Sequence, residues 1–471
     1  MKGGFIGLHP LFSYFVKDYR GRKDTSYSFQ NGGLNPPRNG EKTRLNFIFF
    51  ASYICLPMEE VYAVIDMKSF YASCECAARG LDIFSTPLVV CDPTRTENTI
   101  VMSATPYLKS HYGVKNVERM KDLPKIKRMI YAQPRMEYYI KISAKVVDIF
   151  LDFVSEEDLH VYSIDESFLH LTPYLDMNRC SAEELVGKIQ KRIKEELGLV
   201  ATAGLGPNMF LAKVCLDREG KKKEPYRAHW HMEDVQTKLW KVALTDVWGI
   251  SYGIAGRLAK MGIHTLEALA KTDVAHLEKE FGIIGHQLHD LANGIDRTNI
   301  REKYVPKERN LSIGQTLPRD YDEKGTELLL LEMCDELCFR LRLSQQKCGA
   351  VSLFVRYSAS FGGGFSRQGA LNIPTSSSEK LYEVILELFH RYYEGGPVRG
   401  LGISFSKLSR SSGHQFDLFS SSEDENKAHD LWGAIDEVAS MYGKNAVLRA
   451  SSLTKDSTIK ERHEQIGGHR A

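Results

Sequence analysis

Carboxylates stand at the end of one apolar stretch of this 471-residue chain and inside another. Asp66 follows the apolar run Val61–Ile65, and Asp165 and Glu166 interrupt the apolar stretch 159–171. An unpaired charge in a buried strand is costly, and a bound Mg²⁺ would offset that cost through its preference for oxygen ligands. Two such ions can hold the attacking and leaving oxygens of a phosphoryl transfer. The same pattern is also typical of acids in salt bridges at strand ends, so the spacing alone leaves both readings open.

The elements around these acids alternate between strands and helices. The continuous apolar run before Asp66 predicts a buried strand, and the stretch 159–171 predicts a second one. This alternation indicates an α/β unit. Its other predicted elements are helices at about 69–79, 103–112, 137–153 and 181–198, and strands at 87–91 and 200–205.

The rest of the chain predicts other combinations of secondary structure. Residues 239–294 read as helical, residues 309–409 return to a mixed α/β pattern, and the acidic segment after Ser420 predicts a helix at about 426–442 followed by loose chain. Residues 1–57 show no sustained period, and Pro36-Pro37 breaks any regular element. The functional chain therefore starts either at Met1 or at Met58, and the sequence leaves both open.

Composition narrows the class of protein. With 43% hydrophobic and 26% charged residues the chain is globular rather than disordered or fibrous. No apolar run is long enough to span a membrane, and nine scattered cysteines without a C-x-x-C pair indicate a reducing, cytoplasmic setting. Residues 101–145 hold ten Lys or Arg against three Asp or Glu, which fits a nucleic-acid or phosphate surface and, equally, a solvated basic face.

Three sequence motifs are more specific than these patterns. They read D-M-K-S-F-Y-A-S-C-E at 66–75, Y-S-I-D-E-S-F-L at 162–169 and G-L-G-P-N-M-F-L-A-K at 204–213. In this order they resemble the Y-family of translesion DNA polymerases, in its UmuC-type branch with the UvrX-like proteins of Gram-positive bacteria. The resemblance extends over about residues 60–470.

The resemblance implies an α+β multidomain fold shaped like a right hand, with an α/β palm, small fingers, a helical thumb built on a helix-hairpin-helix, and an α/β little finger. The expected division is an N-terminal extension at 1–57, a palm at 58–85 and 155–238, fingers and palm helices at 86–154, a thumb at 239–305, a little finger at 306–410, and a tail at 411–471.

The resemblance also implies a catalytic set. Asp66, Asp165 and Glu166 match the family's catalytic carboxylates and would hold two Mg²⁺ ions, or Mn²⁺, with Met67 adding a backbone carbonyl. Such ions would favour the deprotonated primer hydroxyl and neutralise the triphosphate.

Three further positions match the family's nucleotide contacts, and Lys109 is a fourth candidate if its helix is shifted. Phe70 and Tyr71 match an aromatic pair in which Tyr71 is the steric gate against ribonucleotides, although core packing is the simpler reading of an aromatic side chain there. Tyr107 matches a triphosphate contact. The basic residue expected three positions later is Ser110 here, and Lys109 would point about 100° away on a regular helix.

A lysine run and two DNA-binding regions complete the predicted site. Lys221 matches a lysine that reaches the β- and γ-phosphates, with Lys222 and Lys223 as alternatives, and Lys68 stands where the family has Asp or Asn. The thumb hairpin would bind DNA phosphates through backbone N–H groups near Gly249, Ser251 and Gly253, with Ser251 replacing the usual second glycine. Candidate backbone contacts in the little finger are Arg309, Arg340, Arg342, Arg356 and Arg367.

A short motif in the tail predicts a protein partner. Gln415-Phe416-Asp417-Leu418-Phe419 resembles the pentapeptide that binds the bacterial β sliding clamp, a partner that would raise the local concentration of enzyme at primer ends. The other expected partners are primer–template DNA and deoxynucleotides, with no membrane, and the chain is expected to be monomeric.

The sequence therefore predicts a template-directed, low-fidelity DNA polymerase that copies past lesions. The main alternative is an inactive relative that binds the clamp and DNA, motivated by Ser110, Ser251 and the unusual first 57 residues. A third reading is another palm enzyme such as a nucleotide cyclase, which the thumb, little-finger and clamp-like segments oppose.

Overall fold

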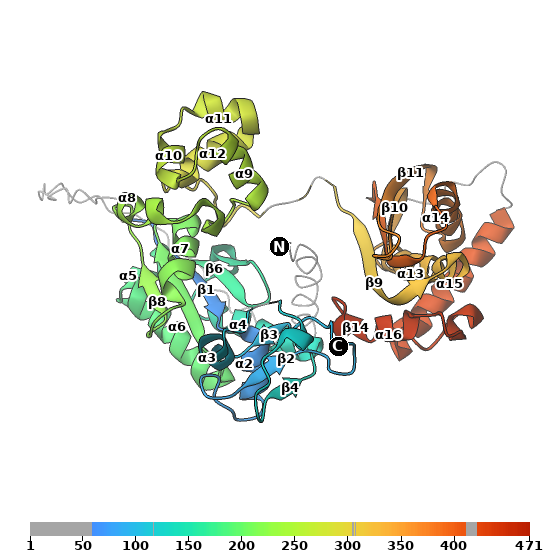
Figure 1. Ribbon diagram of the computed structural model, residues 1–471, viewed down its shortest axis with the longest axis horizontal. Coiled ribbons are helices and arrows are strands. Elements are labelled where there is room, and N and C mark those ends of the chain that lie inside the picture. The colour runs from blue at the N-terminus through green and yellow to red at the C-terminus, as the bar shows by residue number, and fades with distance from the viewer. Residues whose placement is uncertain (1–58, 116, 304–305, 307, 411–421) are drawn as a thin grey trace, which may run out of the picture. The chain divides into compact units, whose positions relative to one another are not determined.

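The computed structural model describes residues 59–115, 117–303, 306, 308–410 and 422–471 (Figure 1). The chain forms two compact units, one ending at Lys303 and the other containing the remainder. The predicted N-terminal extension and the clamp-like motif at 415–419 lie outside the described residues. Within the described part, no helix is both long and apolar enough to cross a membrane.

A five-stranded sheet is the centre of the first unit, in the order β5-β6-β1-β7-β8. Strand β1 runs antiparallel to both of its neighbours, while β7 and β8 are parallel. Because β1 is central, Ala63, Val64 and Ile65 are all fully buried, which explains its unbroken apolar run. The strands are β1 (Tyr62–Met67), β5 (Leu159–Val161), β6 (Glu166–His170), β7 (Ala201–Gly206) and β8 (Arg227–His229).

The single strand expected at 159–171 is in fact a hairpin. Strands β5 and β6 pair antiparallel, and the backbone N–H groups of Tyr162 and Ser163 both donate to the Glu166 carbonyl oxygen at 3.0 Å. The polar turn is stabilised by Ser163 Oγ, which donates to Asp165 Oδ1 at 2.8 Å. Asp165 and Glu166 therefore begin a returning strand and do not interrupt a continuous one.

Helices surround this sheet, and local sequence features position two of them. Helix α6 starts with a capping box between Ser181 and Glu184. Helix α7 lies so close to β7 that a Cβ on Gly204 would sit 2.3 Å from the Ala212 carbonyl oxygen, so the strand needs glycine there. The helices are α2 (Phe70–Ala77), α4 (Met136–Leu151), α5 (Thr172–Asn178), α6 (Ala182–Leu197) and α7 (Met209–Cys215), and a π-helical turn, η3 (Leu216–Gly220), follows α7.

A smaller sheet in the order β3-β2-β4 accompanies helix α3. The helix expected at 103–112 begins only at Pro106, because Ser103 and Ala104 pair with β2 as strand β3. Gly113 ends the helix with φ of 67°. The elements are β2 (Leu88–Val90), β3 (Ser103–Ala104), α3 (Pro106–Tyr112) and β4 (Ile130–Ala132).

Four helices, α9 to α12, form a compact group in the first unit (Figure 1). Their apolar core is continuous with residues of α7 and with the buried Trp230. The chain that leaves this group is fastened to the sheet by Arg301, whose guanidinium donates twice to Asp158, at 2.7 and 3.1 Å. The helices are α8 (Asp234–Thr237), α9 (Tyr252–Lys260), α10 (Leu266–Lys271), α11 (Val274–Phe281) and α12 (Ile283–Ala292).

The second unit is built on a five-stranded antiparallel sheet, in which four strands follow the order β11-β10-β12-β9 and the short β13 pairs with β10. Its apolar core lies between this sheet and helices α13 and α14. Side chains of β10 alternate accordingly, so Leu353 and Val355 are fully buried while Phe354 between them is 48% exposed. The elements are β9 (Leu311–Tyr321), α13 (Glu323–Leu343), β10 (Gln346–Tyr357), β11 (Gly364–Thr375), α14 (Ser378–Tyr392), β12 (Val398–Ser406) and β13 (Ser409–Arg410).

The C-terminal segment, expected to be loose after residue 442, folds onto the second unit. Arg462, only 9% exposed, donates through Nε to Glu336 Oε2 at 3.0 Å. The buried Glu332 accepts hydrogen bonds from Ser457 and Thr458. The segment thus supplies partners to buried acids of α13. Its elements are α15 (Ser422–Tyr442), η6 (Ala450–Leu453), α16 (Ile459–His463), β14 (Gln465–Ile466) and β15 (His469–Arg470).

Arg462→Ala should therefore destabilise the second unit by about 2–3 kcal/mol, since the buried Glu332 and Glu336 both lose this guanidinium, although Glu336 keeps its ion pair with Arg340. Calorimetry of the whole chain should show one unfolding transition moving down and the other unchanged. Arg391→Ala is the matched control, because its ion pair with Glu387 is exposed on both sides and should contribute less than about 1 kcal/mol. Equal shifts for the two variants would contradict this account.

Candidate active site

Three carboxylates meet at the end of the two central strands. Asp66, near the end of β1, lies opposite Glu166 at the start of β6 in the antiparallel register. Asp165 directly precedes Glu166, and its carbonyl oxygen accepts a hydrogen bond from the Met67 N–H at 2.9 Å. The structure therefore brings together Asp66, Met67, Asp165 and Glu166, which the sequence singled out as one set.

These carboxylates lie in surroundings that disfavour their negative charge. Burial raises the pKa of Asp165, and the charge of Asp66 raises it further. Burial likewise raises the pKa of Glu166, and the charge of Lys213 opposes that shift. Crowded, partly buried carboxylate oxygens are a donor set that suits a hard divalent cation.

Two lysines face the same carboxylates. Lys221 Nζ lies 3.0 Å from Asp66 Oδ2, and Lys213 Nζ lies 2.7 and 2.9 Å from the two carboxylate oxygens of Glu166. Burial opposes the charge of Lys221, but Asp66 and Asp217 raise its pKa above the ordinary value. Because Lys222 and Lys223 are exposed, Lys221 is the lysine of the 221–223 run that reaches the site.

Lys213 was not predicted as a site residue, although a signal for it exists. It is the one charged residue of α7, and every residue of that helix is buried. A lysine in such a position needs a charged partner. Glu166, in the apolar stretch 159–171, is an acid that lacks an evident partner of its own. The pair could therefore have been predicted from the sequence.

Lys109, the basic candidate on this helix, also lies near the site, although regular helix geometry would turn its side chain about 100° from the position of Ser110. Its Nζ donates to Ser69 Oγ at 2.9 Å, and burial lowers its pKa while Asp66 opposes that shift. Ser110 instead turns back and donates to the Pro106 carbonyl oxygen. Tyr107 packs against His111 with ring centroids 4.5 Å apart. The side of α3 that carries Lys109 is thus the side that faces the carboxylates.

The aromatic pair at the start of α2 is held by a buried ionic network. Phe70 is buried, and Tyr71 packs on Tyr139 with ring centroids 4.9 Å apart. Burial raises the pKa of Tyr71, and the charge of Asp165 raises it further. Tyr139 in turn donates to the fully buried Glu75 at 2.8 Å.

Glu75 is a second residue that sequence reasoning missed. Burial alone would raise its pKa, but hydrogen bonds from Arg135, Arg79 and Tyr139 hold the pKa below its ordinary value. Arg135 grips both carboxylate oxygens, at 2.9 and 3.0 Å. This fork fixes α2 and α4 relative to each other, so it determines where Tyr71 stands. A glutamate in the otherwise apolar F-Y-A-S-C-E block was the available signal.

The residues predicted to bind DNA lie in both units. Gly249, with φ of 93°, precedes Ser251, whose Oγ caps α9 by accepting from the Ile254 N–H. Gly253 lies in the first turn of that helix. The serine in place of the second glycine therefore serves as an N-cap.

In the second unit, Arg356 on β10 points to Thr316 Oγ1 at 3.2 Å and is exposed. Arg342 is instead paired with Asp436, and Arg340 with Glu336. Of these three arginines, Arg356 is the one with an uncharged partner and the most suitable for a phosphate contact.

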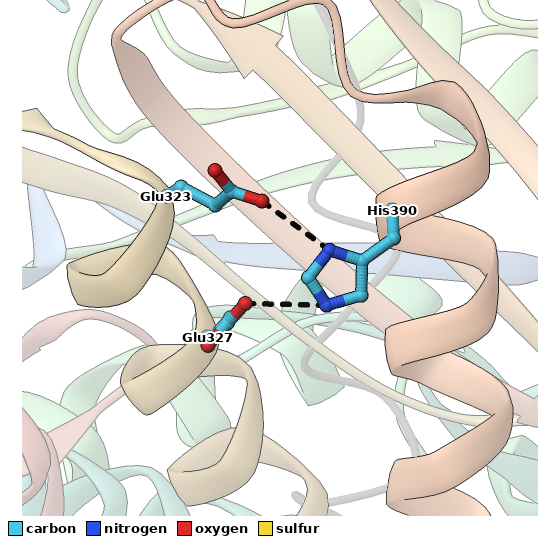
Figure 2. Close-up of side chains that lie close together, drawn as sticks. All are labelled: Glu323, Glu327 and His390. Carbon is cyan, nitrogen blue, oxygen red and sulfur yellow. Dashed lines mark ion pairs between the residues drawn. The ribbon is translucent and has the colours of Figure 1, made fainter.

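The described residues contain one other cluster with metal-ligand side chains, Glu323, Glu327 and His390 (Figure 2). His390 Nδ1 lies 3.3 Å from Glu323, and Nε2 lies 3.2 Å from Glu327. The two ring nitrogens thus face different carboxylates. The glutamates stand at the start of α13 and the histidine in the last turn of α14, where helix dipoles favour these charges. The cluster is better explained as an ion-pair clasp between two helices.

Comparison with known proteins bears on the whole chain. Residues 65–217 match the impB/mucB/samB family, residues 245–296 the DNA polymerase-iota thumb domain, and residues 308–418 the impB/mucB/samB family C-terminal domain. The chain is 36% identical to the putative UV-damage repair protein UvrX of Bacillus subtilis, over 89% of this chain and 99% of that one. It is 33% identical to DNA polymerase IV 2 of the same organism, over 87% and 99%.

The chain belongs to the Y-family of DNA polymerases. Among solved structures, it resembles a chimera of the Y-family DNA polymerases Dbh and Dpo4, with a TM-score of 0.60 and 20% identity over 74% of this chain and 99% of that one. That likeness supports the fold expected from the sequence, a multidomain α+β polymerase. This Y-family member is thus an enzyme of the DNA-directed DNA polymerase class, and its carboxylate cluster lies in the segment matched by the first family model.

Proposed function

We propose that this polymerase performs template-directed, low-fidelity synthesis across damaged DNA, with Asp66, Asp165 and Glu166 as the ligands of two divalent cations, Mg²⁺ by preference. The observation that carries the proposal is the pairing of Asp66 with Glu166 on neighbouring strands. The third carboxylate, Asp165, directly precedes Glu166, so three acids are crowded at one end of the sheet. The site of an inactive binding protein would not need such a costly arrangement.

The proposal assigns a role to the lysines and tyrosines around the carboxylates. The bound cations would supply charge neutralisation at the primer hydroxyl and the triphosphate. Lys109 and Lys221 bind the phosphates as point charges, and Lys213 stabilises the negative charge of Glu166. Tyr71 lies under the sugar, and Tyr107 contacts the triphosphate from the exposed side of α3.

The DNA and protein partners follow the same proposal. Gly249, Ser251 and Gly253 present the start of α9 to a DNA phosphate, and Arg356 contacts the DNA backbone. Gln415–Phe419 binds the β sliding clamp. The cytoplasmic location and the monomeric state stay predictions, and the inactive clamp- and DNA-binding relative remains the alternative against which the activity is tested.

The test is primer extension with a defined template, four deoxynucleotides and Mg²⁺, with and without EDTA and the clamp. We expect extension that follows the template sequence, stops with EDTA and continues past an abasic site with frequent misinsertion. A second template with a changed base sequence separates templated synthesis from untemplated addition. Absence of extension under every condition would favour the binding-only alternative.

Lys109→Met should raise the KM for deoxynucleotides by about tenfold, because one charge–phosphate contact is worth roughly 1–2 kcal/mol. The expected change in kcat is small. Lys115→Met, which removes an exposed lysine just beyond the same helix, is the control. Steady-state kinetics of single-nucleotide insertion measures both constants, and an unchanged KM would remove Lys109 from the triphosphate site.

A further inference from the structure

Asp217 stands behind the two lysines that face the carboxylates. Its Oδ2 lies 3.2 Å from Lys213 Nζ, and its Oδ1 lies 3.0 Å from Lys221 Nζ. The two lysines contact Glu166 and Asp66 respectively. The five side chains form a row of alternating charge in which Asp217 is the central member.

Local structure keeps Asp217 and Lys221 in register. Asp217 lies in the π-helical turn η3, and the Lys221 N–H donates to the Leu216 carbonyl oxygen, five residues back, at 3.0 Å. π turns are frequent at functional sites. The Lys221 carbonyl oxygen also accepts from Lys68 Nζ at 2.8 Å. These two hydrogen bonds hold the backbone at Lys221. Its side chain lies within reach of both Asp66 and Asp217.

The position of Lys221 conflicts with a metal site at Asp66. Its ammonium lies against Asp66 Oδ2, and a cation bound there needs the lone pairs of that carboxylate. Lys221 must therefore leave Asp66 when the cation binds. A partly buried ammonium is less stable without a carboxylate partner, and Lys221 retains Asp217 at 3.0 Å.

We infer that Asp217 is a positioning residue that holds Lys221 in the site after the divalent cation takes its place at Asp66. This inference rests on the proposed function of the carboxylates as metal ligands. Asp217 touches neither the metal nor the substrate and acts through Lys221. Without it, Lys221 has Asp66 as its remaining close partner and competes with the cation.

Asp217→Asn should raise the Mg²⁺ concentration for half-maximal primer extension by about fivefold, the effect of losing one half-exposed ion pair. Asp217→Glu should restore most of the wild-type requirement, because the longer carboxylate still reaches the lysine. Glu219→Gln is the matched control, since it removes one negative charge from the same turn while its nearest cation is Lys238 at 3.9 Å. An equal shift in the control would overturn the inference.

A double variant separates positioning from a general charge effect. In a Lys221→Met background, Asp217→Asn should leave the Mg²⁺ requirement unchanged, because the residue through which it acts is gone. A through-space effect of the lost charge would persist in that background and would overturn the inference.

A readout without catalysis keeps this inference apart from the proposed function. Mn²⁺ titrated onto the full chain without DNA or nucleotide should raise the unfolding temperature, and the rise should be smaller for Asp217→Asn than for wild type and Glu219→Gln. A smaller rise in a chain that extends no primer would support the inference and refute the polymerase proposal. Equal rises together with an unchanged Mg²⁺ requirement would overturn the inference.

Discussion

Replacing Asp165 by asparagine should slow nucleotide incorporation by about a thousandfold or more, since a metal-ligand carboxylate stabilises the transition state by several kcal/mol. The substitution keeps the size of the side chain and its contact with Ser163. It removes the negative charge that burial and Asp66 already disfavour. Glu166→Gln should have an effect of the same order. The double variant should lose less activity than the product of the two single losses, because the two carboxylates act as one unit.

Single-turnover extension of a labelled primer measures this loss, and DNA affinity measured by anisotropy shows that the variant still folds and binds. Asp152→Asn is a suitable control, because Asp152 is an exposed acid of the same unit, paired with Arg192. If Asp165→Asn kept a tenth of the wild-type rate, Asp165 would not be a metal ligand in the reacting complex.

Tyr71→Ala should weaken discrimination against ribonucleotides by about tenfold to a hundredfold. A hydroxyl forced into a packed site costs about 1–3 kcal/mol, and each 1.4 kcal/mol is a factor of ten in the ratio of kcat/KM values. The clash depends on a ring that cannot retreat. Tyr71 is backed by Tyr139, which is held by Glu75, so the phenol cannot move away from the sugar.

The ratio of kcat/KM for a deoxynucleotide to that for the matching ribonucleotide is the quantity to compare. Tyr138→Ala removes a neighbouring aromatic ring of α4 that packs under Arg135 and should leave the ratio near the wild-type value. Tyr71→Phe should retain the discrimination, because the ring rather than the hydroxyl meets the sugar. A ratio unaffected by Tyr71→Ala would return Tyr71 to a role in core packing.

Strand β1 and the carboxylate at its end could be predicted, because the sequence around Asp66 is enough to indicate both. The run before Asp66 is apolar since β1 has strands on both sides, and a charge at its end has few explanations. The hairpin at 159–171 could not be predicted from hydrophobicity, because both of its strands are apolar and only Ser163 and Asp165 mark the turn. Which lysine of the 221–223 run faces inward also depends on a π turn that leaves no clear sequence signal.

Pairings between distant residues explain the remaining differences. Lys213 and Glu166 are 47 positions apart, and Arg462 and Glu336 are 126 apart. Arg462 and Glu336 each look like an ordinary surface residue until they are placed beside each other. The C-terminal segment is therefore predicted to be loose chain, although its charges match buried acids of α13. A charged residue within a helix of buried residues, such as Lys213, is the feature that would have revealed one of these pairs.

The packing of the last residues against α13 predicts how truncated forms of the chain behave. A stop codon after residue 442 would leave the clamp-like motif and all catalytic residues in the product, yet Glu332 and Glu336 would lose Arg462, Ser457 and Thr458. Such a product would carry exposed acids and apolar surface on its second unit and become a substrate for cellular proteases. Frameshifts late in the reading frame should therefore behave as null alleles and not as harmless truncations.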